Sequence, residues 1–442
     1  MKRLLALAYF FPPLGGGGCQ RTLKLVRYLE PHGWAVSVVT TRDSDYWIAD
    51  PTLLEEVPGS TEVLRVGGWT AHRTLGWLTR GGVRLERPQG TRRGAAFRVL
   101  RTLQAWTLIP DGFVGWSRAA RRAAAERIRR GGVDVLWTTS SPESSHLAGL
   151  ALARRFGIPW VADFRDPWVG RATYRPPTPL HDRAHRALER AVIERADRVT
   201  MVSEAMIEAY RRRYPHVPAS RFEFLPNGYD PEDWIRAREV EQQGAREDEA
   251  CFVLLHAGQL AHRPTVRTLL DAARALIAED PSLEGTLRVR FLGGNEDLPA
   301  GEPARLGLGR VVDLRDSVSH RAALVAMHRA EALALLGHGG AGDALIYTGK
   351  IYEYLTSGRP VLAILDPGPA QDLLRAAGAG PILAPGDVAG TAAALRRWIS
   401  DWRGGASADR AVDAGLLRGS TRQEIAARAA QILACLRGSL AP

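Results

Sequence analysis

The second half of the chain holds two basic residues whose positions suit a bound phosphate. Arg263 follows the turn at Gly258 and Gln259, which links a predicted buried strand to a predicted helix. Lys350 stands at the start of another predicted helix, and Glu353 follows three positions later on the same face. The helix dipole disfavours an ammonium at a helix N-terminus, so a bound phosphate would explain the lysine. The simpler alternatives are a solvated arginine and a surface ion pair between Lys350 and Glu353.

A run of glycines near the N-terminus could also contact a phosphate. It spans residues 15–18, between a predicted strand and a predicted helix. Glycines let backbone N–H groups approach an anion, and the following helix N-terminus favours negative charge. The run matches neither the GxGxxG pattern nor the Walker pattern, so a flexible turn is an equal alternative. The candidate contacts are Gly16, Gly17 and Gly18.

Charged residues gather at the end of the predicted strand IPWVADF. Asp163 lies within it, and Arg165 and Asp166 follow it. Ligands of open α/β sheets bind at the carboxyl ends of the strands. Two carboxylates and one arginine at that end could therefore form an acid/base or binding site. The alternative is a loop capped by salt bridges.

The strand and helix patterns of the chain predict a parallel α/β scaffold that would position these residues. Residues 3–10, 20–31 and 34–41 have the patterns of a strand, a helix and a second strand. The region 43–132 is irregular and rich in arginine, and the strand–helix rhythm then resumes. A charged segment at 235–249 predicts a linker, after which the rhythm starts again.

Two such series predict an α/β fold built from two Rossmann-like, doubly wound domains. We expect the first at residues 1–234, with a basic insert at about 70–132, and the second at residues 250–416. A C-terminal helix within 417–442 is expected to pack back on the first domain.

Charge and composition limit the partners and the compartment. The net charge is +11, and residues 70–132 alone hold 14 arginines against 3 acidic residues. Basic and apolar residues on neighbouring helical faces suit an anionic membrane surface, while a solvated arginine face is the bland alternative. The segment lacks an aromatic-basic nucleic-acid motif, so no nucleic acid is expected. No apolar run is long enough to span a bilayer, and the 3 cysteines are far apart. Both features predict a cytoplasmic protein. Any membrane contact is expected to be peripheral, at the inner face.

Six segments together resemble glycosyltransferase family 4, a family with the GT-B fold. They are FPPLGGGGCQRTLKLVRYLEPHGWAVSVVT, DVLWTTSSPESSHLAGLALARRFGIPWVADFRDPW, ADRVTMVSEAMIEAY, FLPNGYDPEDW, LLHAGQLAHRPTVRTLLDAA and IYTGKIYEYLTSGRPVLAI. They occur in the family's order over nearly the full length. The resemblance implies two Rossmann-like domains with an interdomain cleft. It also implies transfer of a sugar from a nucleoside-diphosphate sugar to an acceptor hydroxyl with retention of configuration and without a metal.

The resemblance also assigns roles at matching positions. Gly16 and Gly17, followed by Gly18, match the glycines near the donor phosphates, and Gly258 and Gln259 begin the donor-binding loop of the second domain. Arg263 and Lys350 match the cations that hold the diphosphate, Glu353 matches the acidic residue that binds the ribose, and Asp166 matches an acceptor-side aspartate. Three positions depart from the family pattern: Leu345 replaces a glutamate that contacts the donor sugar, Arg165 replaces a histidine, and Gln259 replaces a frequent arginine.

The sequence leaves several functions open. The expected acceptor belongs to cell-surface polysaccharide or glycolipid synthesis, where it would be lipid-linked, or to secondary metabolism. One alternative is a nucleotide-sugar epimerase of the same fold. Others are a transferase-like protein that only binds sugar nucleotide, suggested by Leu345, and a non-catalytic basic nucleic-acid-binding protein.

Overall fold

The computed structural model forms two compact units. Unit 1 comprises Met1–Pro226 and Arg422–Pro442, and unit 2 comprises Asn227–Thr421. Within them the structure describes residues 1–42, 48–70, 102–171, 174–241, 250–260, 263–293, 298, 301–339, 344–347, 349–406, 413 and 415–438. For Arg263, Arg437 and Gly438 it describes the backbone only. Each unit is treated separately below.

Unit 1 contains a seven-stranded parallel sheet with the order β3-β2-β1-β4-β5-β6-β7. The strands are β1 (Lys2–Leu7), β2 (Trp34–Thr41), β3 (Glu62–Val66), β4 (Val135–Ser140), β5 (Trp160–Phe164), β6 (Arg198–Met201) and β7 (Phe222–Phe224). Leu4 of β1 pairs with Val36 on one side and with Val135 on the other, so the strand order reverses between β1 and β4. Ligands of doubly wound sheets bind at such a reversal, beyond the carboxyl ends of the strands.

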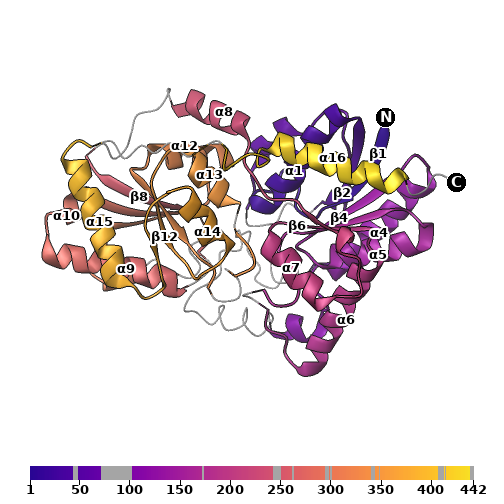
Figure 1. Ribbon diagram of the computed structural model, residues 1–442, viewed down its shortest axis with the longest axis horizontal. Coiled ribbons are helices and arrows are strands. Elements are labelled where there is room, and N and C mark those ends of the chain that lie inside the picture. Colours follow the sequence, from indigo (N-terminus) through magenta and orange to yellow (C-terminus); the bar gives the residue numbers. More distant parts are fainter. Residues whose placement is uncertain are drawn as a thin grey trace. The chain divides into compact units, whose positions relative to one another are not determined.

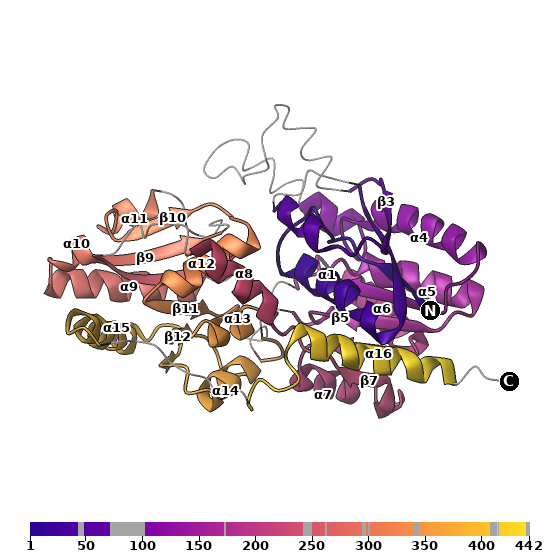
Figure 2. The same ribbon diagram turned by 90° about the horizontal axis from the view of Figure 1, so that it is seen from above.

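Helices and the sheet of unit 1 share an apolar core. The helices are α1 (Gly17–Leu29), α4 (Val114–Arg129), α5 (Ser144–Phe156), α6 (Pro179–Arg195), α7 (Glu204–Arg213) and α16 (Arg422–Gly438), with short 3-10 helices η1 (Glu30–His32), η2 (Pro51–Glu56) and η3 (Ala219–Arg221). The C-terminal helix α16 packs on α1, where Ile425 and Leu433 join Leu4 and Val26 in the core (Figure 1). On the same unit α4 packs on α5 (Figure 2).

Unit 2 contains a six-stranded parallel sheet with the order β10-β9-β8-β11-β12-β13. The strands are β8 (Phe252–Ala257), β9 (Leu287–Leu292), β10 (Val312–Arg315), β11 (Ala332–Leu336), β12 (Val361–Ile364) and β13 (Ile382–Leu383). Here the order reverses between β8 and β11. The apolar content of these two strands, FVLLHA and ALALL, is that of strands covered on both faces.

The helices of unit 2 enclose two apolar clusters. They are α8 (Pro231–Glu241), α9 (Arg263–Glu279), α10 (Leu283–Thr286), α11 (Glu302–Arg305), α12 (His320–Arg329), α13 (Lys350–Thr356), α14 (Pro369–Ala376) and α15 (Val388–Arg403). One cluster contains Leu269 of α9 and Leu395 of α15, and these helices lie side by side in the unit (Figure 2). The other contains Leu324 of α12 and Tyr354 of α13.

Three sequence predictions need correction. The irregular region contains strand β3, whose EVLRV sequence lies half-buried at the edge of the sheet. The predicted linker is helical up to Glu241, because α8 has a proline and acidic residues in its first turn and a Glu232–Arg236 pair one turn apart. Its Trp234 is buried and donates to Oγ1 of Thr356 at 2.9 Å. The first helix begins at Gly17, within the glycine run, and not near residue 20.

The other predicted strands and helices that fall on described residues are present, and the two parallel sheets confirm the α/β class. Among the described helices, none is both long enough and apolar enough to cross a membrane.

Candidate active site

The turn after β8 and the start of α13 meet at the carboxyl end of the unit 2 sheet. Gly258 has φ of 113° and directly follows β8. A Cβ added there would lie 2.7 Å from Nζ of Lys350, so the glycine leaves room for the ammonium. A Cβ added at Gly293, after β9, would lie 2.8 Å from the carbonyl carbon of Gly258, so this glycine too allows a close approach. The fold therefore brings Lys350 onto the loop that the sequence associated with a phosphate.

The Lys350 ammonium is held in a desolvated position. Burial lowers the pKa of Lys350 to about 8, and the nearby Glu353 charge only partly opposes this shift. Among the described residues no carboxylate lies within ion-pair distance of Nζ. In β8, burial and then the Lys350 charge lower the pKa of His256 to about 3, so this imidazole is neutral at pH 7. A desolvated cation without a close protein anion is the arrangement expected where a ligand supplies the negative charge.

Glu353 lies one turn after Lys350 and pairs with a histidine. Its Oε1 is 2.8 Å from Nε2 of His320, the first residue of α12. The Nδ1 atom of the same imidazole lies 3.8 Å from Oδ2 of Asp233 on α8. Glu353 is therefore part of a group drawn from three helices, and the predicted surface pair with Lys350 is not the contact observed.

Three further positions of unit 2 were singled out by the sequence. Gln259 is exposed and follows Gly258 directly. Arg263 begins α9, and its side chain lies outside what the structure describes. Leu345 is partly buried. Whether Arg263 and Gln259 contact a ligand stays a prediction.

The glycine run of unit 1 opens α1 and receives an arginine from β5. Gly16 caps α1, and Gly16 and Gly17 are exposed. A Cβ on Gly18 would clash with the guanidinium of Arg165. Arg165 donates through Nε to the Ser140 carbonyl and through Nη2 to the Ser141 carbonyl at 3.1 Å.

The arrangement of Arg165 leaves it available to an anion. Its partners at the end of β4 are the carbonyl oxygens of Ser140 and Ser141, and among the described residues none is a carboxylate. The ring of Phe10 lies 6.0 Å from its Cζ. The structure thus brings two features predicted from the sequence, the glycine run after β1 and Arg165 after β5, to the end of β4.

Asp163 is structural. Its two oxygens accept from Arg21 at 2.6 and 2.9 Å and from the hydroxyls of Thr139 at 2.8 Å and Thr200 at 2.7 Å. Despite complete burial, the Arg21 charge and these hydrogen bonds hold the pKa of Asp163 below its usual value. For this residue the salt-bridged alternative is the one the structure supports.

Asp166 lies beside a charged cluster that the sequence did not reveal. Glu143 forms an ion pair with Arg171, and the charges of Glu143 and then Asp166 raise the pKa of Arg171. Asp111 accepts from the backbone N–H of Ser144 at 2.8 Å, at the start of α5. Burial and the Glu143 charge raise the pKa of Asp111 to about 7. Asp111 and Asp166 thus both belong to the charged surroundings of Arg171, and burial raises the pKa of the first of them.

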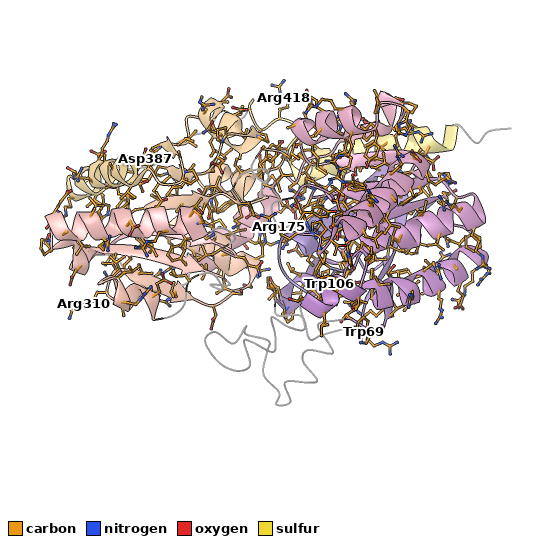
Figure 3. The ribbon with its side chains drawn as sticks, turned by 90° about the horizontal axis from the view of Figure 1, so that it is seen from below. Trp69, Trp106, Arg175, Arg310, Asp387 and Arg418 are labelled. Carbon is orange, nitrogen blue, oxygen red and sulfur yellow. The ribbon has the colours of Figure 1, made fainter. Side chains whose placement is uncertain are left out.

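Most described arginines of the basic segment face solvent, and Arg127 is the buried exception among them. Five arginines of α4 and its end are exposed: Arg118, Arg121, Arg122, Arg129 and Arg130. Leu103 and Trp106 are about half exposed, and Trp106 contacts His181 next to the exposed Leu180. Trp69, Trp106 and Arg175 are labelled on this unit in Figure 3. The arginines of the basic segment that precede residue 102, Arg98 and Arg101 among them, lie outside the described residues.

Much of the first half of the chain matches a known protein family. Residues 15–233, which include the glycine run, Arg165 and Asp166, match the family model described as Glycosyltransferase Family 4. The chain belongs to glycosyltransferase family 4. The family resemblance inferred from the sequence is therefore confirmed, and the protein is a glycosyltransferase. No curated protein sequence matches it.

Several solved structures share the fold of this glycosyltransferase. Sucrose-phosphate synthase from Thermosynechococcus elongatus is 17% identical with a TM-score of 0.63, over 99% of this chain and 100% of that one. HepE from Anabaena, in complex with UDP and glucose, is 17% identical with a TM-score of 0.64, over 98% and 100%. WaaG, a glycosyltransferase involved in lipopolysaccharide biosynthesis, is 16% identical with a TM-score of 0.56, over 98% and 95%. The predicted GT-B fold is confirmed.

Sequence reasoning missed several charged residues of the glycosyltransferase. His320 and Asp233 beside Glu353, and Asp111, Glu143 and Arg171 beside Asp166, share no local spacing with the motifs. The available signal for Asp111 was that it is one of only 3 acidic residues in the basic segment.

Proposed function

We propose that this family 4 enzyme uses a nucleoside-diphosphate sugar, bound by unit 2. Lys350 contacts the diphosphate, the turn at Gly258 and Gln259 offers backbone N–H groups, and Glu353 accepts hydrogen bonds from the ribose hydroxyls. Arg263 is the second cation of this site. The observation that carries the proposal is the partly buried, desolvated Lys350 ammonium, which has no close carboxylate among the described residues and lies at the strand-order reversal of the sheet.

The chemistry follows from where charge develops. When the bond between the sugar C1 and the diphosphate oxygen breaks, negative charge grows on the leaving phosphate. An ammonium already desolvated at that position stabilises the charge without reorganising. HepE from Anabaena was solved with UDP and with UDP-glucose, which supports a sugar nucleotide as donor here.

Unit 1 supplies the acceptor side of the reaction. The exposed glycines Gly16 and Gly17 and the Arg165 guanidinium favour an anionic group, and Asp166 orients the acceptor hydroxyl. We assign retention of configuration: the acceptor oxygen bonds to C1 on the face the diphosphate leaves, and the acceptor proton passes to the leaving phosphate. This scheme needs no nucleophilic carboxylate pair of the kind that glycosidases use.

The acceptor class we favour is lipid-linked, in cell-surface polysaccharide or glycolipid synthesis. Exposed arginines on α4 and the exposed apolar side chains of Leu103, Trp106 and Leu180 belong to the same unit as Asp166. Such a surface suits an anionic bilayer, where each basic residue contributes about 1 kcal/mol. WaaG acts in lipopolysaccharide biosynthesis, which agrees with this class. A soluble acceptor of secondary metabolism is the second candidate.

Nucleotide release from a panel of donors tests the donor assignment. Purified protein is incubated with UDP-, ADP-, GDP- and dTDP-sugars, and the released nucleoside diphosphate is measured with and without a membrane-lipid extract as acceptor. We expect release from one nucleotide class, faster with lipid present. Release from none of the donors under either condition would contradict the proposal, and conversion of donor to an isomeric nucleotide sugar would favour the epimerase.

A further inference from the structure

Three helices of unit 2 bring together a histidine and two carboxylates. His320 begins α12, Glu353 lies on α13 and Asp233 lies on α8. Nε2 of His320 is 2.8 Å from Oε1 of Glu353, and Nδ1 is 3.8 Å from Oδ2 of Asp233. The three side chains are 19%, 20% and 9% exposed. The imidazole therefore lies between the carboxylates and touches the one assigned to the ribose.

The short contact fixes the direction of the hydrogen bond. An ionised carboxylate can only accept, so Nε2 of His320 carries the proton and donates to Oε1 of Glu353. A glutamate side chain has several rotatable bonds and loses rotamer freedom when it is ordered. Holding one carboxylate oxygen removes that freedom before ligand binds. Each carboxylate oxygen has two lone pairs, so the group can still accept from hydroxyls.

The surrounding helices hold His320 in turn. Ser319 caps α12 by accepting from the Ala322 N–H, which fixes where the helix starts. Helix α8 packs on α12, and its Trp234 donates to Thr356 of α13 at 2.9 Å. Asp233, one residue before Trp234, is thereby kept opposite Nδ1. The imidazole therefore has support from the neighbouring helices α8 and α13.

We propose that His320 is a positioning residue for nucleotide binding: it holds the Glu353 carboxylate in the orientation that accepts the ribose hydroxyls, and Asp233 orients the imidazole. This inference rests on the proposed role of unit 2 as the nucleoside-diphosphate site. Its specific consequence is that His320 contributes to affinity only when the ribose hydroxyls are present.

The test uses two matched substitutions in the full chain. His320→Gln places an amide nitrogen near Nε2, so it can still donate to Glu353, whereas His320→Asn is too short to reach it. Calorimetry first finds which of UDP, ADP, GDP and dTDP binds the wild-type protein. That ligand and its 2′,3′-dideoxy counterpart are then titrated into both variants. We expect His320→Asn to weaken the nucleoside diphosphate about tenfold. Its affinity for the dideoxy compound should change less than about twofold, and His320→Gln should stay near wild type.

A second histidine on the same helix provides the control. Nδ1 of His328 lies 2.7 Å from Oε2 of Glu241, a similar pair that does not involve Glu353. His328→Asn should leave both affinities unchanged. If His320→Asn does not fold, Asp233→Asn keeps the histidine but removes the carboxylate charge that orients its ring, and should weaken the hydroxyl-bearing ligand selectively.

The outcomes separate the two claims. Equal weakening of both ligands would make His320 merely structural, and unchanged affinity for both would remove its role; either result overturns the inference and leaves the donor site standing. If the wild-type protein binds none of the four nucleoside diphosphates, the donor proposal fails and the inference falls with it.

Discussion

Replacing Lys350 with methionine removes the partly buried ammonium and keeps a side chain of similar length. Two unit charges about 4 Å apart attract by about 4 kcal/mol at an effective dielectric constant near 20. Losing one preorganised donor at a reacting centre typically costs about 2.7–4 kcal/mol. We therefore expect kcat/KM for the donor to fall by about 100- to 1000-fold.

The same substitution should stabilise the empty protein. Burial lowers the pKa of Lys350 from 10.5 to about 8, so at pH 7, below both values, the folded state carries the full cost of a desolvated ammonium. One pKa unit corresponds to about 1.4 kcal/mol, and allowing for partial exposure we expect the free energy of unfolding to rise by about 2 kcal/mol. A gain in stability together with a loss of activity is the signature of a residue kept for function.

Initial rates of nucleotide release and urea denaturation at pH 7 measure the two effects. The control is Arg310→Met, which removes an exposed positive charge of the same unit (Figure 3) and should change neither quantity by much. An unchanged kcat/KM for Lys350→Met would refute the diphosphate role. A loss of stability would refute the reasoning from burial.

Three further predictions concern unit 1. Arg165→Lys cannot keep both carbonyl contacts of the guanidinium, so we expect the rate of sugar transfer to fall by about 10- to 100-fold. The affinity for nucleoside diphosphate, measured by calorimetry, should stay unchanged. Weaker nucleotide binding would argue against an acceptor-side role. Burial and Glu143 raise the pKa of Asp111 to about 7, so the folded state keeps a proton that the unfolded chain loses near pH 4. The free energy of unfolding should therefore fall as the pH rises from 5 to 8, and Asp111→Asn should flatten this slope in denaturant titrations. An unaltered slope would assign the pH dependence to other groups. The wild-type protein should sediment with vesicles that contain anionic lipid, the Trp106→Ser variant should sediment less, and added salt should release both. Equal recovery of the wild type in the supernatant with neutral and with anionic vesicles would remove the membrane proposal.

The sequence predicted most of the scaffold, because its strands are apolar and its helices are periodic. The strand β2 at Trp34–Thr41 has the predicted bounds, since WAVSVVTT is rich in β-branched residues and Gly33 precedes it. Strand β3 was missed because a five-residue, half-buried edge strand gives little apolar contrast inside an arginine-rich segment. Helix α8 was missed because it is stabilised by Trp234 packing and local ion pairs more than by an apolar stripe.

The candidate sites were predictable only where chemistry lay within a motif. Lys350 could be singled out because it stands at a predicted helix start, where a phosphate binds readily, but its contact with the Gly258 turn came only from the fold. His320 could not be found, since its partners Glu353 and Asp233 are on other helices and meet it only through tertiary packing. Asp163 appeared equivalent to Asp166 in sequence, yet the fold neutralises it with Arg21, a partner 142 residues away.

Proton uptake on nucleotide binding tests the central claim that Lys350 contacts the donor diphosphate. At pH 8 the Lys350 amine, with its pKa of about 8, is about half protonated, and a bound diphosphate favours the charged form. Calorimetric titration of the nucleoside diphosphate in two buffers with different ionisation enthalpies gives the number of protons taken up. We predict about half a proton per nucleotide for the wild-type protein and none for Lys350→Met. Binding without proton uptake by the wild type, or with equal uptake by both proteins, would contradict the assignment of the diphosphate to Lys350.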